Sequence, residues 1–162
     1  MYTKLLNETL RRLRGEKVEI ERDIKTDISI TSKIPFSFVQ EEAERLKIIA
    51  KISNISNKDH ARTVLNELLN EYGKLPKEIY QLVNIALLKA LAMKNNVKQI
   101  TINKNRMAIT YYNDVNIDNL IKKVHRFSYF KFENGQLPSI RLDELNFSIS
   151  SALNYFIEFL SI

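Results

Sequence analysis

The hydrophobic period of the chain changes at Val97, and this change constrains the fold more than any other feature of the sequence. Before this residue, apolar side chains recur every three or four positions, as in amphipathic helices. After it, apolar and polar residues alternate around Ile100 and Ile109, as in half-buried strands. A helical half followed by hairpin, helix, hairpin and helix predicts an α+β fold with a small, mainly antiparallel sheet.

Capping residues mark the expected helix boundaries in the first half. Asp59 is a candidate N-cap, Gly73 follows an apolar stripe that ends at Tyr72, and Pro76 can begin the next helix without losing a backbone donor. We expect helices over residues 2–14, 40–53, 59–72 and 77–94, and one isolated strand over residues 23–30. The inward faces expected for the second and third helices are Val39, Ala43, Leu46, Ile49 and Ala50, and Ala61, Val64, Leu65, Leu68, Leu69 and Tyr72.

The second half carries two hairpin signals. Asn134 and Gly135 form a favoured tight-turn pair between two apolar runs, and an earlier pair of runs is separated by residues 103–105. A short helix is expected to begin at Asn116 or Asp118. A final apolar helix is expected over residues 146–160.

Composition limits the chemistry that the chain can perform. The 162 residues include no cysteine, which excludes disulfides, thiolate metal sites and cysteine nucleophiles. The length suits one domain, and 44% hydrophobic with 27% charged residues is typical of a globular protein. No apolar stretch approaches the ~20 residues that span a bilayer. We therefore expect no membrane association and a cytoplasmic location.

Glycine usage argues against nucleotide chemistry in this chain. Only Gly15, Gly73 and Gly135 occur, each at an expected helix end or turn, so no glycine cluster is left to cradle phosphate. Asp143 and Glu144 follow a predicted strand, but an acidic pair without a phosphate loop has no nucleotide to act on. The two histidines, His60 and His125, lie on different predicted helices. We expect no catalytic, cofactor-binding or metal-binding residue, and hence no enzyme.

Basic charge is the one positive sign of a ligand. The net charge is +6, with a candidate basic patch at Lys122, Lys123 and Arg126. Tyr129, Phe130 and Phe132 follow this patch, and aromatic rings beside cations can stack on single-stranded bases. Cations at a helix C-terminus are also favoured for structural reasons. A basic DNA-binding module is therefore an alternative function.

An ordered series of short motifs resembles the C-terminal domain of the bacterial transcription-repair coupling factor (Mfd) family. Residues 2–16 read YTKLLNETLRRLRGE, and they are followed by Ile34-Pro35, Phe38-Val39 and an E-x-x-R-L pattern at Glu42 to Leu46. The most specific piece is ELLNEYGKLPKEI, Glu67 to Ile79, which is similar to the family pattern E-L-x-D-R-F-G-x-L-P-x-E-V. The last third resembles the family in pattern only.

The resemblance implies a single C-terminal domain, residues 1–162, of a longer DNA-translocating ATPase. Within it, 1–22 would be a linker helix and extension from the motor, 23–96 the strand and helical half, and 97–162 the hairpin and helix half. Family members release stalled RNA polymerase and recruit excision repair. The domain is implied to be a non-catalytic, autoinhibitory module that packs on the UvrB-like module of the same chain and masks the surface that recruits UvrA.

The same resemblance implies where this contact forms. It points to Glu67, Asn70 and Glu71, where the family has glutamate, aspartate and arginine. Residues three apart on a helix share one face, so Glu67 and Asn70 are neighbours. ATP and Mg²⁺ are implied only for the motor of the parent protein, with no cofactor in this domain. RNA polymerase and DNA are implied as partners through the parent.

Overall fold

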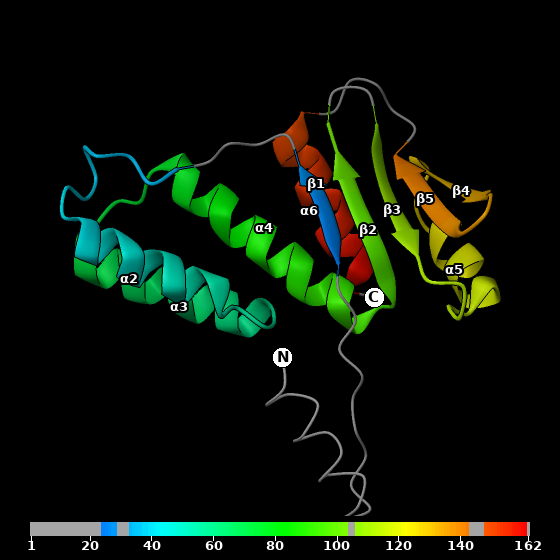
Figure 1. The fold of residues 1–162 in the computed structure, drawn as a ribbon, viewed down its shortest axis with the longest axis horizontal. Coiled ribbons are helices and arrows are strands. Elements are labelled where there is room, and N and C mark those ends of the chain that lie inside the picture. Colours follow the sequence, from blue (N-terminus) through cyan, green and yellow to red (C-terminus); the bar gives the residue numbers. More distant parts are fainter. Residues whose placement is uncertain (1–23, 29–32, 104–105, 143–147, 162) are drawn as a thin grey trace, which may run out of the picture.

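A five-stranded sheet with helices stacked on one of its faces forms the framework of the chain (Figure 1). The computed structural model describes residues 24–28, 33–103, 106–142 and 148–161. The helix expected over residues 2–14 and the linker expected over 1–22 lie outside this described part. In chain order the elements are β1 (Lys25–Ile28), α2 (Glu42–Ser53), α3 (Lys58–Tyr72), α4 (Lys77–Lys94), β2 (Val97–Ile102), β3 (Met107–Tyr111), α5 (Ile117–Val124), β4 (Phe130–Asn134), β5 (Pro138–Leu142) and α6 (Ile149–Leu160).

The sheet has the strand order β1-β2-β3-β5-β4. β2 with β3, β3 with β5, and β4 with β5 pair antiparallel, while β1 pairs parallel with β2. Both predicted hairpins form, the second across the turn after Asn134. The α+β class with a mainly antiparallel sheet is therefore confirmed.

The first strand is not isolated, contrary to the sequence-based expectation. Thr26 pairs with Ile100, and Ile28 pairs with Ile102, so β1 extends the sheet beside β2. The physical reason is alternation: Ile24 and Ile28 pack against the core while Lys25 and Asp27 remain exposed. A strand of only four residues gains its hydrogen-bonding partner from a segment more than seventy residues later.

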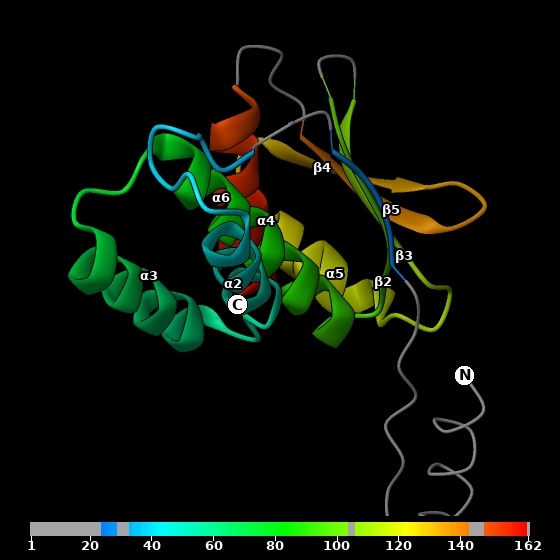
Figure 2. The same cartoon turned by 60° about the vertical axis from the view of Figure 1, so that its left-hand side comes forward.

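The register of the strands separates an apolar face from a polar face. Ile100, Ile109, Ile140 and Phe132 align across four strands. This face meets α4, α5 and α6, whereas no helix of the described residues covers the opposite face (Figure 2). The opposite face carries the row Thr101, Ala108, Arg141 and Lys131. The largest fully buried aromatic side chains, Phe156 and Phe159, come from α6.

α2 and α3 form an outer layer against α4, away from the sheet (Figures 1 and 2). The inward face expected for α2 is wrong within the helix: Ile48 and Ile52 are buried, while Leu46 and Ile49 are exposed together with both alanines. Val39, which precedes the helix, is buried as expected. α2 has apolar residues on two sides, so periodicity alone does not select the buried one. Arg45 helps to set the helix orientation, since its Nη2 donates to the Ile34 carbonyl at 2.7 Å.

No helix in the described part of the chain is both long enough and apolar enough to cross a membrane.

Candidate functional site

The third helix presents the residues that the sequence singles out for docking. α3 buries Ala61, Val64 and Leu68, which fixes its inner side against the other helices. Asn57, rather than the expected Asp59, is its N-cap, because the Asn57 side chain accepts a hydrogen bond from the His60 backbone N–H at 2.8 Å. The helix therefore begins at Lys58, one residue before the predicted cap.

Glu67, Asn70 and Glu71 are all exposed on α3. Glu67 Oε2 lies 3.3 Å from Lys51 Nζ of α2, and the two side chains are 52% and 44% exposed. The structure therefore brings the three predicted residues to the outer side of one helix. A cation on a docking partner would have to compete with Lys51 for the Glu67 carboxylate.

The site predicted from the sequence leaves out one exposed apolar side chain of α3, Leu69. Leu69 was expected in the buried stripe, yet it is 39% exposed. It lies between the buried Leu68 and the exposed Asn70, on the flank of α3 where the core ends. The signal available in the sequence was the width of the stripe, since Leu65, Leu68 and Leu69 together exceed what one neighbouring helix covers.

Tyr72 ties the end of α3 to the start of α2. Its hydroxyl donates to Glu44 Oε2 at 2.6 Å, and its ring lies 5.4 Å from that of Phe38. The hydrogen bond to Glu44 raises the pKa of Tyr72 to about 12, and burial adds to this effect. The same bond and Lys47 lower the pKa of Glu44. This contact therefore holds the C-terminal end of α3, just beyond Asn70 and Glu71, against α2.

We expect Glu44→Gln to lower the pKa of Tyr72 from about 12 toward the usual value near 10. Tyr72 has a folded-state pKa above its unfolded value, so the bond contributes fully below pH 10 as long as Glu44 is ionised, and this contribution disappears as the pH rises through about 12. The lowered pKa of Glu44 means that the contribution also disappears at acidic pH, as Glu44 takes up a proton. Absorbance titration of the tyrosines, with Tyr72→Phe to assign the transition, measures the shift. An unchanged Tyr72 transition in Glu44→Gln would contradict the assignment.

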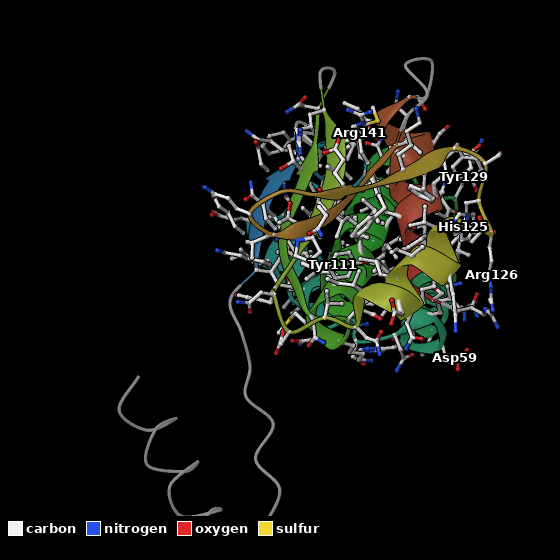
Figure 3. The ribbon with its side chains drawn as sticks, turned by 90° about the vertical axis from the view of Figure 1, so that its right-hand side faces the viewer. Asp59, Tyr111, His125, Arg126, Tyr129 and Arg141 are labelled. Atoms are coloured by element: carbon white, nitrogen blue, oxygen red, sulfur yellow. The ribbon has the colours of Figure 1, made fainter. Side chains whose placement is uncertain are left out.

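The predicted basic patch is only partly assembled. Lys122 and Arg126 are exposed at the end of α5, as is His125, and Figure 3 shows His125, Arg126 and Tyr129 along one side of the molecule. Lys123 is half-buried with its ammonium 5.7 Å from the Phe159 ring. Burial lowers the pKa of Lys123, and the charge of Arg126 adds to this effect.

The aromatic residues beside this patch belong to the core. Phe130 is 4% exposed, and its ring lies 5.3 Å from Phe156 and 5.1 Å from Phe159. Tyr129 and Phe132 are partly buried and pack against the same core, with Tyr129 4.5 Å from Tyr155. Stacking of bases on these rings, as the sequence suggested, is therefore not supported: alternation in β4 turns Phe130 and Phe132 toward the core, and Tyr129, just before the strand, packs on Tyr155.

Metal and phosphate sites were not expected, and the described residues contain no group of three or more His, Asp or Glu side chains arranged to hold a metal ion. His60 serves the helix start, where its Nδ1 accepts from the Ser56 backbone N–H at 3.2 Å. Asp143 and Glu144 lie outside the described residues, as does Gly15. The remaining candidate is the outer side of α3.

Comparison with known proteins places the chain in a family. Residues 28–120 match the family model described as the TRCF domain, which is more than half of the chain. The transcription-repair-coupling factor of Borreliella burgdorferi is 25% identical over 157 residues, which cover 95% of this chain and 14% of that relative. The Myxococcus xanthus factor is 28% identical over 120 residues, covering 73% and 10%. The chain thus spans about one seventh or less of these relatives.

A solved structure has the same fold. The crystal structure of the C-terminal domain of transcription-repair coupling factor matches with a TM-score of 0.75 at 20% identity, over 90% of this chain and 96% of that one. The family match ends at residue 120, whereas the structural match reaches most of the remaining hairpin and helix. The chain therefore belongs to the TRCF domain family and is a domain of a transcription-repair coupling factor.

Proposed function

We propose that this domain is a regulatory, autoinhibitory docking module of its parent protein. The outer side of α3, carrying Glu67, Asn70 and Glu71, contacts a UvrB-like module of the same parent and masks the surface that recruits UvrA. The observation that carries this proposal is the exposure of all three residues on one helix of a TRCF domain. Residues 1–162 act as one C-terminal domain of the parent.

The binding energy expected from the outer side of α3 is small enough for a contact that opens and closes. An exposed ion pair contributes at most about 1 kcal/mol, so Glu67 alone does not hold two modules together. Asn70 supplies a hydrogen-bonding amide where the family has a charge. Leu69, 39% exposed, offers apolar area beside it. A latch worth a few kcal/mol is one that a ligand with different affinity for the two states can release.

The rest of the machinery belongs to the parent in this proposal. ATP and Mg²⁺ act in a translocase motor, and RNA polymerase and DNA engage other modules. This domain contributes neither catalysis nor cofactor binding, and senses engagement through release of α3. The parent works on chromosomal DNA, so we place it in the bacterial cytoplasm.

Charge reversal at Glu67 tests the latch. In the full-length parent, Glu67→Lys is expected to raise UvrA affinity about two- to five-fold, since losing one exposed pair weakens the closed state by up to about 1 kcal/mol. UvrA binding to the parent, measured by calorimetry or biolayer interferometry, gives the result. The double variant Lys51→Glu with Glu67→Lys keeps an ion pair within the domain but reverses the charge toward the partner. It is therefore expected to behave like Glu67→Lys.

The controls separate docking from folding. Glu158→Lys changes an exposed acid on α6, away from α3, and is expected to leave UvrA affinity unchanged. Unfolding of each variant shows whether the domain remains intact. Equal UvrA binding by the parent and by Glu67→Lys would remove Glu67 from the latch. If the double variant instead bound UvrA as the unchanged parent protein does, Glu67 would act through its ion pair with Lys51 and not through contact with the partner module.

A direct DNA contact is the second candidate, favoured by the net charge of +6 and the exposed Lys122 and Arg126. It predicts binding whose logarithmic affinity falls with logarithmic salt by about 0.9 per phosphate contacted on duplex DNA. Reversing both residues to glutamate should then reduce this slope by about two. Absence of binding at low salt excludes this function for the domain.

A further inference from the structure

A hollow of ≈ 340 Å³ lies between α2 and α4. Eight of its ten lining residues are apolar, with Ile49 and Ile52 from α2 and Leu82, Ile85 and Met93 from α4 among them. We call it the α2–α4 groove. It is distinct from the outer side of α3, because no residue of α3 lines it.

Apolar side chains are unusually exposed along this groove. Ile49 is 46% exposed and Met93 is 53% exposed, on opposite walls. Leu46, 59% exposed, lies one turn before Ile49 and therefore continues the same side of α2. These three account for half of the six large apolar side chains that are exposed in the described part of the chain. Single exposed apolar residues are ordinary, but a contiguous set beside a hollow marks an interaction site.

Lys89 gives the groove its charge. It is the one charged residue among those that line the hollow, and no carboxylate of the described residues lies within 4.0 Å of its Nζ. Lys94, five residues further along α4, donates to the Ser56 carbonyl at 2.7 Å, beside the lining residue Ile55. This end of the groove therefore bears two positive charges and no described acid that pairs with them.

We propose that the α2–α4 groove binds an amphipathic helix of a partner protein whose apolar stripe is flanked by carboxylates. Apolar side chains spaced at i, i+3, i+4 and i+7 fill the hollow, and a glutamate or aspartate beside the stripe pairs with Lys89. Binding of the apolar face of a partner helix in a groove between two helices is a helix-in-groove mode of recognition.

The charge of the groove disfavours the other occupants. A second copy docked through the same face would bring its own Lys89 and no lining carboxylate, so it offers no acid to pair with this charge. Residues 1–14 carry an apolar pattern of their own, but they hold four Lys or Arg residues and one Glu, so they bring like charge to Lys89. An acidic helix is complementary where neither of these is.

Two synthetic peptides test the proposal. Both are helices of about 18 residues, five turns, with leucine at i, i+3, i+4 and i+7. One carries glutamate and glutamine on the remaining positions, and the other carries lysine and glutamine. Fluorescence anisotropy with this chain is expected to show the glutamate peptide binding about tenfold or more tightly than the lysine peptide, with the preference set by Lys89.

Variants locate the binding. Ile49→Glu and Met93→Glu change exposed residues, so the fold should persist, and each is expected to weaken the glutamate peptide about tenfold or more, as loss of an anchor does. Lys89→Glu is expected to reverse the preference between the two peptides. Phe36→Glu places the same new charge on an apolar side chain that is 70% exposed and does not line the groove, and it is the matched control that should bind the glutamate peptide as the unchanged chain does.

Several outcomes would overturn the proposal. Equal binding of both peptides, or an unchanged preference in Lys89→Glu, would show a non-selective apolar surface. Self-association of the chain in sedimentation velocity that Ile49→Glu abolishes would assign the groove to a second copy. Tight binding of a peptide of residues 1–23, in competition with the glutamate peptide, would assign it to the amino-terminal segment. No binding of either peptide would leave the groove without the proposed role.

Discussion

Phe156→Ala is expected to reduce the free energy of unfolding by about 3–5 kcal/mol, the range for removing a buried phenylalanine ring. Phe156 is fully buried in α6. Its ring lies 5.3 Å from that of Phe130 in β4, so it joins the last helix to the edge of the sheet. The loss combines the transfer energy of the ring with the cavity that rigid neighbours leave behind. Urea unfolding followed by circular dichroism measures it.

Glu158→Ala provides the matched control on the same helix. Glu158 is exposed two residues further along α6, so its truncation leaves no cavity and should change stability by less than about 0.5 kcal/mol. Both variants remove a side chain from α6, and only one removes packing. If Phe156→Ala cost less than about 1 kcal/mol, the α6–β4 contact would not be part of the stable core.

The class of fold was predictable because the hydrophobic period reports local structure. Residues around Val83 and Leu87 repeat at helical spacing, while Ile100 and Ile102 alternate, and the structure has α4 and β2 at these places. The hydrophobic period does not predict which strands pair with each other. β1 was expected to be isolated because the sequence of a short strand does not indicate which distant strand it pairs with. Its pairing with β2 is seen only in the assembled sheet.

The buried side of α2 shows a different limit. Leu46, Ile48, Ile49 and Ile52 surround much of this helix, so its sequence fits two orientations. The choice between these orientations depends on the positions of α4 and Ile34, which are set by the tertiary structure. The consequence is functional: the side that periodicity selected as core is the side that borders the α2–α4 groove.

The candidate site on α3 was predictable only in outline. Helical spacing correctly predicted that Glu67 and Asn70 lie together on the exposed side. The Lys51–Glu67 pair and the exposed Leu69 depend on how α2 packs against α3, which no local pattern encodes. The burial of Phe130 likewise depends on tertiary structure, because packing of the sheet against the helices determines which aromatic rings are exposed to a ligand.

Gly73→Ala is expected to destabilise the domain by about 1–3 kcal/mol through backbone strain alone. Gly73 ends α3 with φ 79° and ψ −144°, a region that almost only glycine adopts, while its N–H donates to the Leu69 carbonyl at 2.9 Å. A Cβ at this position would meet nothing within 4 Å, so steric contact with other residues does not contribute. Urea unfolding measures the loss.

Two further variants show that the cause is the backbone. Gly135→Ala also adds a methyl group into open space, but Gly135 lacks a positive φ, so its stability should stay within about 0.5 kcal/mol of the unchanged chain or rise slightly. Gly73→Asn should not rescue the position, because asparagine tolerates the left-handed helical region at ψ near +45°, far from −144°. A stable Gly73→Asn variant would mean that residue 73 adopts the ordinary left-handed helical conformation. The backbone conformation of Gly73 would then not determine how the chain passes from α3 to α4.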